Sequence, residues 1–381
     1  MNYKIFPSGF FIGFVALVYV NAYAKSRRGV NHKAIVGTLV AEAYYKLPPS
    51  LPLLEHKTDP LLSSAAPGLD TQVLLGDRLK VIKSNIKHEG TKWVEVKLLD
   101  QLTFKNNSWV AKTCFINSND CFTGKLATNW RSNAIVTSLV ASVFVKPGID
   151  SLQLGRLSLG TRVKTKKEIA HGWTEVILAS GLTGCVRSSD IVTDDALNRW
   201  SISIKRDQVV RVAKNFQDSP YRWGCASGFD SNSRALTGVD CSGLCYLAYR
   251  TIGLQIPRDS HDQFLASSPI KFGGDLKAGD LIFIARIDTD KKIVKVHQVM
   301  MVIGKDLLIE STGLGVSNIK DLSNPKEACT RLVSSFQHPH IKKSLKDLWH
   351  GQINEHNQLI FLGTFLGDKA VYSKLSKSFL R

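Results

Sequence analysis

The sequence predicts an α+β multidomain protein in which two small β-barrels precede a larger α+β domain. Three observations support this prediction. The chain has 381 residues, more than one hydrophobic core usually organises. Its first half carries a repeated series of short β-type segments. Its second half opens with helical spacing and continues with strand-like segments, an order typical of α+β domains.

The chain opens with the features of a secretory signal. One lysine precedes an apolar run from Phe10 to Val20, and Ala22-Tyr23-Ala24 then gives the small-residue pattern that signal peptidase cuts. The run is short for a permanent membrane anchor. We therefore expect residues 1–24 to be removed, which leaves no stable membrane span and a mature, secreted protein in the periplasm or at the cell wall.

The chain is strongly basic, with a formal net charge of +18. An exported basic protein suits anionic surroundings, such as cell-wall polymers or lipid head groups. No long basic run and no nucleic-acid recognition motif is present, so nucleic acid is not an expected partner. The plainer alternative is that the excess lysine only keeps the surface soluble.

Seven cysteines are an odd number for an oxidising compartment, so at least one thiol is expected to stay unpaired. They are Cys114, Cys121, Cys185, Cys225, Cys241, Cys245 and Cys329. Cys114 and Cys121 are close enough in sequence to close a small loop. The sequence nevertheless fixes no pairing among the seven.

Two segments of the first half resemble one another. The matches are "AIVGTLVAEAYYKLP" (34–48) with "AIVTSLVASVFVKPG" (134–148), "LLGDRLKVIK" (74–83) with "LSLGTRVKTK" (157–166), and "KWVEVKL" (92–98) with "GWTEVIL" (172–178). Short β-branched stretches between glycine and polar turns are the pattern of a small barrel. Their order resembles the bacterial SH3 domain, which implies SH3-like domains over 25–120 and 130–192. The alternative is an unrelated pair of β domains.

The pattern changes from residue 193 onward. A linker over 193–205 leads to a third domain over 206–366, and residues 367–381 form a tail. Helical spacing begins in "KRDQVVRVAKNF", and "AGDLIFIARI", "IVKVHQVMMVI" and "DLLIEST" then predict an antiparallel sheet. In the first repeat, the proline-rich insertion "LPPSLPLLEHKTDPLLSSAAPG" is expected to be an exposed loop.

Cys241 lies where a predicted helix begins. The apolar residues that follow have the spacing of a half-buried helix that Gly253 would end: Leu244, Leu247, Ala248 and Ile252. In the first turn, unpaired N–H groups and the helix dipole favour an anion, so the thiol is expected to ionise more easily than a free cysteine. A buried, inert cysteine is the alternative, and it suits Cys245 better than Cys241.

A nucleophilic thiol needs a base, and His297 is a lone imidazole in an otherwise apolar strand. If Lys305 and Asp306 form a two-residue turn, Glu310 lies opposite Met301 and shares a sheet face with His297. Glu310 could then accept the imidazole N–H and fix the tautomer. A slip of one residue would turn Glu310 to the other face. A satisfied core histidine and a surface glutamate are the alternatives.

Five motifs in order carry a resemblance to a known family: "SPYRWGCAS" (219–227), "GVDCSGL" (238–244), "IPRDSHDQ" (256–263), "LKAGDLIFI" (276–284) and "VHQVMMVIG" (296–304). Together they resemble the NlpC/P60 cysteine peptidases. With the SH3-like pair, the layout is similar to exported γ-D-glutamyl-L-diamino acid endopeptidases, which trim peptidoglycan stem peptides. The resemblance implies a papain-like α+β core in which Cys241 attacks and His297 is the base.

The resemblance also implies a substrate site for a stem peptide with a free N-terminal L-alanine. It places Asp240 near that ammonium, makes Tyr221 and Trp223 walls of the pocket, and gives polar contacts to Ser242, Asp259 and Ser260. From the residues alone, the tyrosine and tryptophan are packing residues. The protein is expected to act as a monomer on murein fragments.

Two departures from the family pattern stand out. Cys225 replaces the second glycine of the usual Trp-Gly-Gly, which places another thiol near the site. Glu310 stands where relatives have histidine, asparagine or glutamine. A carboxylate there would stabilise the imidazolium and shift the pH optimum upward.

Other functions compete with this interpretation. One rival is a cell-wall-binding SH3 protein with an inactive papain-like domain, and another is an acyl transferase that uses the same Cys–His pair. Four histidines invite a metal hypothesis, namely His338, His340, His350 and His356, but neither HExxH nor paired CxxC spacing is present. We therefore expect no metal and no other cofactor.

Overall fold

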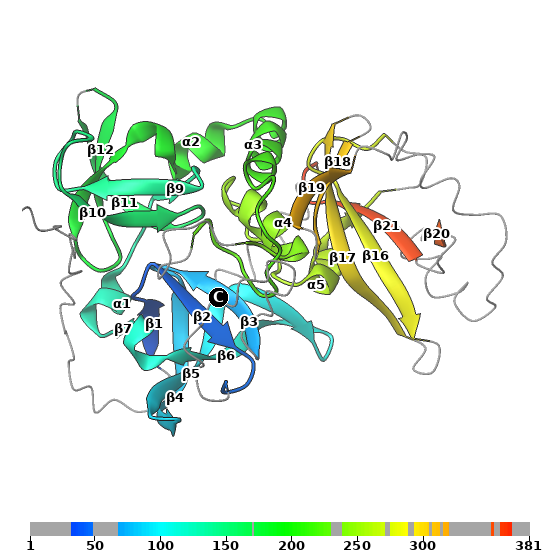
Figure 1. Cartoon of the computed structure of the whole chain (residues 1–381), viewed down its shortest axis with the longest axis horizontal. Coiled ribbons are helices and arrows are strands. Elements are labelled where there is room, and N and C mark those ends of the chain that lie inside the picture. The colour runs from blue at the N-terminus through cyan, green and yellow to red at the C-terminus, as the bar shows by residue number, and fades with distance from the viewer. Residues whose placement is uncertain are drawn as a thin grey trace, which may run out of the picture.

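The computed structural model describes residues 32–48, 68–169, 171–229, 238–270, 275–288, 293–304, 307–312, 315–319, 352–353 and 359–367. These residues form three sheets, with helices between the second and the third (Figure 1). Several predicted features lie outside the described residues: the signal over 1–24, most of the proline-rich insertion, the Lys305–Asp306 turn, Cys329, nearly all of the tail, and His338, His340, His350 and His356.

The first sheet contains seven strands. They are β1 (Lys33–Val36), β2 (Val40–Tyr44), β3 (Leu69–Leu74), β4 (Arg78–His88), β5 (Thr91–Lys105), β6 (Ser108–Asn117) and β7 (Cys121–Thr123), in the order β3-β2-β6-β5-β4-β1-β7. A 3-10 turn, η1 (Ser118–Asp120), and helix α1 (Lys125–Asn129) complete this part. Alternate β-branched and apolar residues of these strands form its core.

The second sheet repeats the topology of the first. Its strands are β8 (Ala134–Val136), β9 (Val140–Phe144), β10 (Gln153–Ser158), β11 (Arg162–Ile169), β12 (Trp173–Ile177), β13 (Thr183–Arg187) and β14 (Ile191–Thr193), with η2 at Ser188–Asp190. Their order is β10-β9-β13-β12-β11-β8-β14, so each strand takes the place of its counterpart in the first sheet. The predicted internal repeat is thus present as a repeated strand order. Ile35 of β1 and Leu75, directly after β3, pack into the core of the second sheet.

Neither sheet closes into the barrel that the sequence predicts. Among the described residues, β3 and β7 end the first sheet without pairing with each other, and β10 and β14 end the second in the same way. The β3 segment is instead covered by the third domain. The Gln72 side-chain oxygen accepts hydrogen bonds from the Ala226 amide at 3.0 Å and the Ser227 hydroxyl at 2.8 Å. Covering a sheet edge in this way removes the need for closure.

The last part of the chain has the predicted order of helices followed by strands, and its first helix and the start of its second fall within the predicted linker over 193–205. Its elements are α2 (Asp194–Arg199), α3 (Ile202–Asn215), α4 (Cys241–Arg250), α5 (Ser260–Ala266), β15 (Ser268–Pro269), β16 (Leu281–Asp288), β17 (Ile293–Gly304), β18 (Leu307–Thr312), β19 (Gly315–Ile319), β20 (Gln352–Ile353) and β21 (Leu359–Thr364). The sheet order is β15-β21-β16-β17-β18-β19, and β20 pairs with β21.

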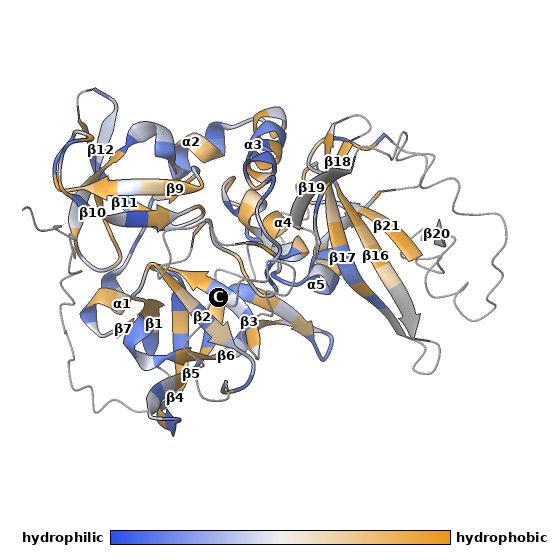
Figure 2. Ribbon diagram, viewed as in Figure 1, coloured by the Kyte–Doolittle hydropathy of each residue, from blue (hydrophilic) through white to orange (hydrophobic). Residues whose placement is uncertain are grey.

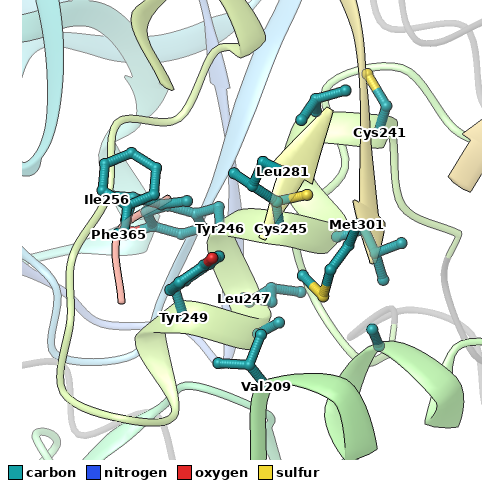
Figure 3. Close-up of a cluster of buried hydrophobic side chains, with 14 of the residues drawn as sticks. Val209, Cys241, Cys245, Tyr246, Leu247, Tyr249, Ile256, Leu281, Met301 and Phe365 are labelled. Carbon is teal, nitrogen blue, oxygen red and sulfur yellow. The ribbon is translucent and has the colours of Figure 1, made fainter. Parts of the chain in front are cut away.

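Helices α3 and α4 pack on one face of this sheet. Leu247 and Val209 lie in one cluster with Leu281 and Met301, and Cys241 lies at the edge of that cluster (Figure 3). Along α3, hydrophilic and hydrophobic residues share the helix, as expected for an element that buries one side only (Figure 2). None of the helices in the described part of the chain is long and apolar enough to cross a membrane.

Arg250, the last residue of α4, joins all three parts of the molecule. Its side chain is buried and forms an ion pair with Asp77 of the first part. Its Nε donates to the carbonyl of Gly160, in the turn between β10 and β11, at 2.8 Å, and its Nη1 donates to the Tyr246 hydroxyl at 2.7 Å. The position of α4, and of Cys241 at its other end, therefore depends on both N-terminal sheets.

Candidate active site

Asp240 caps the helix that begins with Cys241. Its carboxylate accepts hydrogen bonds from the Gly243 amide at 2.6 Å and the Gly224 amide at 2.8 Å. This is the usual way in which an aspartate satisfies the free amides of a first turn. At the other end of α4, Gly253 adopts a φ of 77°, which ends the helix as predicted. The predicted place of Cys241 at a helix start is confirmed.

The remaining lone pairs of Asp240 are also occupied. Both ends of the Arg258 guanidinium donate to its carboxylate, at 2.9 and 2.7 Å, and the Ser242 hydroxyl donates at 3.2 Å. A carboxylate has about four lone-pair sites, and Asp240 faces five donors of its own chain. Its geometry is that of a helix cap and a buried ion-pair partner, and it offers little to a substrate ammonium.

Cys241 is buried beside the middle of β17. The backbone N–H groups of Val299 and Ser242 donate to its sulfur. Burial and the neighbouring Asp240 carboxylate raise the pKa of Cys241 to about 12, and these backbone bonds and Arg258 only partly oppose them. The shift is opposite to the one predicted from the helix start, because desolvation of the thiolate outweighs the first-turn amides. The thiol therefore rests in its neutral form.

His297 lies in a β-bulge of β17. Ile284 pairs with Gln298 and Ala285 pairs with Val296, which leaves His297 as an extra residue in the ladder between β16 and β17. Its side chain is exposed, and Val299, whose amide contacts Cys241, follows two residues later. Bulges often occur beside active sites, where they turn a side chain away from the regular alternation. The thiol of α4 therefore contacts β17 two residues away from the imidazole.

His261 of α5 braces this bulge, and the sequence analysis gave it no role. Its Nδ1 accepts a hydrogen bond from the Val296 amide at 3.3 Å. Burial and the nearby Lys295 ammonium lower the pKa of His261. The neutral ring thus supplies the acceptor that an amide at the bulge needs. The sequence offered one indication that His261 matters, its place in the "IPRDSHDQ" motif. The motif does not show which strand α5 packs against, so the contact with Val296 could not be predicted.

The predicted register of Glu310 is wrong by one residue. Gly304 pairs with Leu307, as a turn at Lys305–Asp306 requires, but β17 carries a second irregularity between Val302 and Gly304. Met301 consequently pairs with Ile309 and not with Glu310. The half-buried Glu310 carboxylate instead accepts a hydrogen bond from the Gln298 side chain at 3.1 Å. Burial raises the pKa of Glu310, and the bond from Gln298 opposes that rise.

Tyr221 and Trp223 lie in the loop that precedes the nucleophile. The Tyr221 backbone pairs with Val239, next to Asp240. Burial and the Asp240 carboxylate raise the pKa of the Tyr221 phenol above the usual range. The Trp223 side chain is 60% exposed, which is unusual for tryptophan and leaves it available to a ligand. Cys225 faces away from this surface.

The Cys225 thiol packs into the first sheet with Tyr44, Leu69 and Trp93. Gly224, directly before it, has a φ of 75°, and a Cβ at this position would meet the Leu69 side chain at 3.0 Å. The departure from the Trp-Gly-Gly pattern is thus a packing feature of the interface with the first sheet. The six cysteines among the described residues are all free thiols.

Ser242 and Asp259 are held by other parts of the chain. The Ser242 hydroxyl is buried and accepts from Arg258 at 3.0 Å, and its carbonyl accepts from the Gln263 side chain at 3.0 Å. Asp259 pairs with Lys112 of β6 at 2.8 Å. Ser260 is the first residue of α5. Lys112 is a contact that sequence reasoning missed, because no local pattern in β6 points to a residue so distant in sequence.

In the part of the chain that the structure describes, no group of three or more histidine, cysteine or acidic side chains converges in a way that could hold an ion.

Comparison with known proteins matches a family model to the C-terminal part of the chain. Residues 218–347 match the NlpC/P60 family model. The C-terminal part of this chain is an NlpC/P60 domain. Within it lie the Cys241 helix, the His261 helix and the His297 strand.

Similarity to other proteins extends beyond the NlpC/P60 domain. The chain is 29% identical over 247 residues to a protein of Bacillus cereus named gamma-D-glutamyl-L-lysine dipeptidyl-peptidase, covering 64% of this chain and 67% of the relative. It is 28% identical to dipeptidyl-peptidase 6 of Lysinibacillus sphaericus, and the match covers 49% of this chain and 70% of that relative. The crystal structure of an NlpC/P60 family protein from Bacillus cereus superposes with a TM-score of 0.59 at 25% identity, covering 75% of this chain and 93% of that one.

The neutral resting state of Cys241 predicts that alkylation of this thiol in the NlpC/P60 domain depends on pH. With a pKa of about 12, the thiolate fraction grows throughout the accessible pH range. The rate of labelling by iodoacetamide should therefore rise by about tenfold per pH unit between pH 7 and 10. The rate is measured by mass spectrometry of the peptide that contains Cys241. A labelling rate that is already high at pH 7 and does not rise further up to pH 10 would instead indicate that the thiol is ionised as a thiolate–imidazolium pair.

The His261 brace predicts a second effect within the NlpC/P60 domain. His261→Ala removes the acceptor for the Val296 amide and loosens the bulge, so kcat should fall by about tenfold through misplacement of His297. His261→Asn keeps an acceptor oxygen in a similar place and should recover most of the loss. Peptide hydrolysis by both variants checks this. Equal impairment of the two variants would show that the accepted hydrogen bond is not the cause.

Proposed function

We propose that this protein is an exported cysteine endopeptidase that hydrolyses the bond between γ-D-glutamate and the diamino acid of peptidoglycan stem peptides. One observation carries the proposal. Within an NlpC/P60 domain, the Cys241 sulfur accepts a hydrogen bond from the backbone amide of Val299, and Val299 lies only two residues after His297. The names of the relatives support the bond, since they include gamma-D-glutamyl-L-lysine dipeptidyl-peptidase. Relatives named peptidoglycan or murein endopeptidases support cell-wall peptidoglycan as the substrate class and action outside the cytoplasm.

The mechanism begins with a neutral thiol. His297 takes the proton of Cys241 as the sulfur attacks the γ-glutamyl carbonyl, which avoids a free thiolate in a buried site. Amides of the first turn of α4 stabilise the oxyanion of the tetrahedral intermediate. The imidazolium then protonates the departing amine of the diamino acid, leaving a thioester. Water, deprotonated by His297, attacks that thioester and restores the thiol.

Glu310 enters this mechanism as a positioning residue. Its carboxylate holds the Gln298 side chain, and Gln298 directly follows His297 in the bulge. It thus acts on the strand that carries the imidazole. Tyr221, which is near enough to Cys241 for the two charges to interact, and the exposed Trp223 are proposed to contact the peptide.

The two N-terminal sheets are proposed to be SH3-like domains that contact the wall polymer. Their repeated strand order and the net charge of +18 support this role. The alternative of acyl transfer uses the same thiol and imidazole, and only the acceptor of the thioester differs.

Cleavage of defined peptides tests the proposal. The exported protein is incubated with L-Ala-γ-D-Glu-meso-diaminopimelate and with the N-acetylated peptide, and products are followed by mass spectrometry. Release of free diaminopimelate from either peptide is the expected result. Failure to cleave both would contradict the proposed function. Transfer of the acyl group to an added amine, in preference to water, would favour the transferase.

A further inference from the structure

A buried ammonium lies between two carboxylates beside the start of α5. The Lys112 Nζ of β6 is 2.9 Å from Asp70 Oδ2 and 2.8 Å from Asp259 Oδ2. The Lys112 side chain is 7% exposed, whereas those of Asp70 and Asp259 are 23% and 42% exposed. Two acids that reach the surface are thus neutralised from within by a residue of the first domain.

This ion cluster is linked directly to the residues around the nucleophile. Asp259 follows Arg258, whose guanidinium bonds both Asp240 and Ser242, the two neighbours of Cys241. Asp70 precedes Thr71, whose hydroxyl accepts from the Arg258 Nε at 3.1 Å. The cluster therefore stands one residue away from the contacts that hold the helix start, on the side where the first domain meets α5.

Three acids near the helix start are already paired with cations of the same chain. Asp240 is bound by Arg258, and Asp70 and Asp259 are bound by Lys112. Burial alone would lower the pKa of Lys112, but the two carboxylates outweigh it and raise that pKa, so the ammonium stays charged. A substrate ammonium would have to displace a covalently tethered one and leave it buried without a partner.

We propose that Lys112 determines specificity for the N-terminus of the substrate, so that the enzyme accepts stem peptides whose α-amine is acylated, such as peptides still joined by an amide to a larger wall polymer. The inference rests on the proposed function. It differs from the expectation that the family resemblance gave, in which an acid at the site binds a free L-alanine ammonium. Here the ammonium is supplied by the protein itself.

The wild-type protein alone gives the first test. At pH 6.5, where a peptide α-amine is charged, kcat/KM for the free and N-acetylated peptides should agree within about threefold. A preference of about tenfold or more for the free amine would overturn the inference while leaving the proposed function intact. Cleavage of neither peptide would reject the proposed function itself, and the specificity inference with it.

Substitution of Lys112 gives the second test. Lys112→Met frees two carboxylates and should create a preference of about tenfold for the free amine, expressed in KM and lost as the pH rises past about 8. Lys112→Arg should keep the wild-type ratio. Lys97→Met, on the exposed side of the neighbouring β5, is the matched control and should also keep it. An unchanged ratio in a folded Lys112→Met protein would overturn the inference. If that variant does not fold, the wild-type and Lys112→Arg ratios decide.

Discussion

Replacing Cys241 with alanine should reduce hydrolysis of the stem peptide by at least about 10⁴-fold, because the nucleophile is lost. The fold should survive, since the Asp240 cap and its bonds to Gly243, Gly224 and Arg258 do not use the thiol. Initial rates of diaminopimelate release measure the effect, and a thermal melt confirms that the variant is folded.

Cys245 provides the matched control for this substitution. It lies one turn along α4, fully packed among apolar side chains, and burial raises the pKa of its thiol well above the usual value (Figure 3). Cys245→Ala should cost some stability by leaving a small cavity, with kcat within about threefold of wild type. Equal loss of activity in both variants, or full activity in Cys241→Ala, would exclude Cys241 as the nucleophile.

The second large effect concerns stability. Arg250→Met should lower the free energy of unfolding by about 3–5 kcal/mol, because it leaves the Asp77 carboxylate buried without its partner. The double variant Arg250→Met with Asp77→Leu should recover part of this loss, since no charge then remains uncompensated. Denaturant unfolding followed by tryptophan fluorescence gives the differences.

Arg78 offers a comparison for the Arg250 experiment within the same sheet. It pairs with Asp100 at 2.6 Å, but its side chain is 47% exposed. Arg78→Met should therefore cost only about 1 kcal/mol or less. If Arg250→Met cost no more than this, the buried pair with Asp77 would not be a main tie between the domains.

Features with a local sequence signal were predicted well. The helix at Cys241 followed from the apolar spacing after it and from Gly253, and the repeat followed from direct similarity between two segments. The capping role of Asp240 had a signal too, because aspartate directly before a helix is the usual N-cap. The family resemblance drew attention to a ligand in its place.

The bulges of β17 explain where the prediction of the site failed. An extra residue at His297 and another irregularity between Val302 and Gly304 each shift the alternation of side chains. No residue type in the strand marks either irregularity. Because side chains alternate between the two faces of a sheet, a shift of one residue changes the predicted face of every later position. The register of Glu310 was consequently wrong by one residue.

Contacts between domains had no signal at all. The pairing of Lys112 with Asp259 and the path of the Arg250 side chain to Gly160 join segments far apart in the chain. Only the packing of finished domains creates them. The open edges of the N-terminal sheets have the same origin, because the loop that covers β3 comes from the third domain.

The convergence of Arg250 on both N-terminal sheets has a mechanical consequence. Independent motion of the three parts is restricted, because the Arg250 side chain contacts all of them at one point. A polymer bound by the N-terminal sheets would therefore reach the thiol at a constant distance from its binding site. The spacing of cuts along that polymer would then be set by the dimensions of the protein and not by chance encounter.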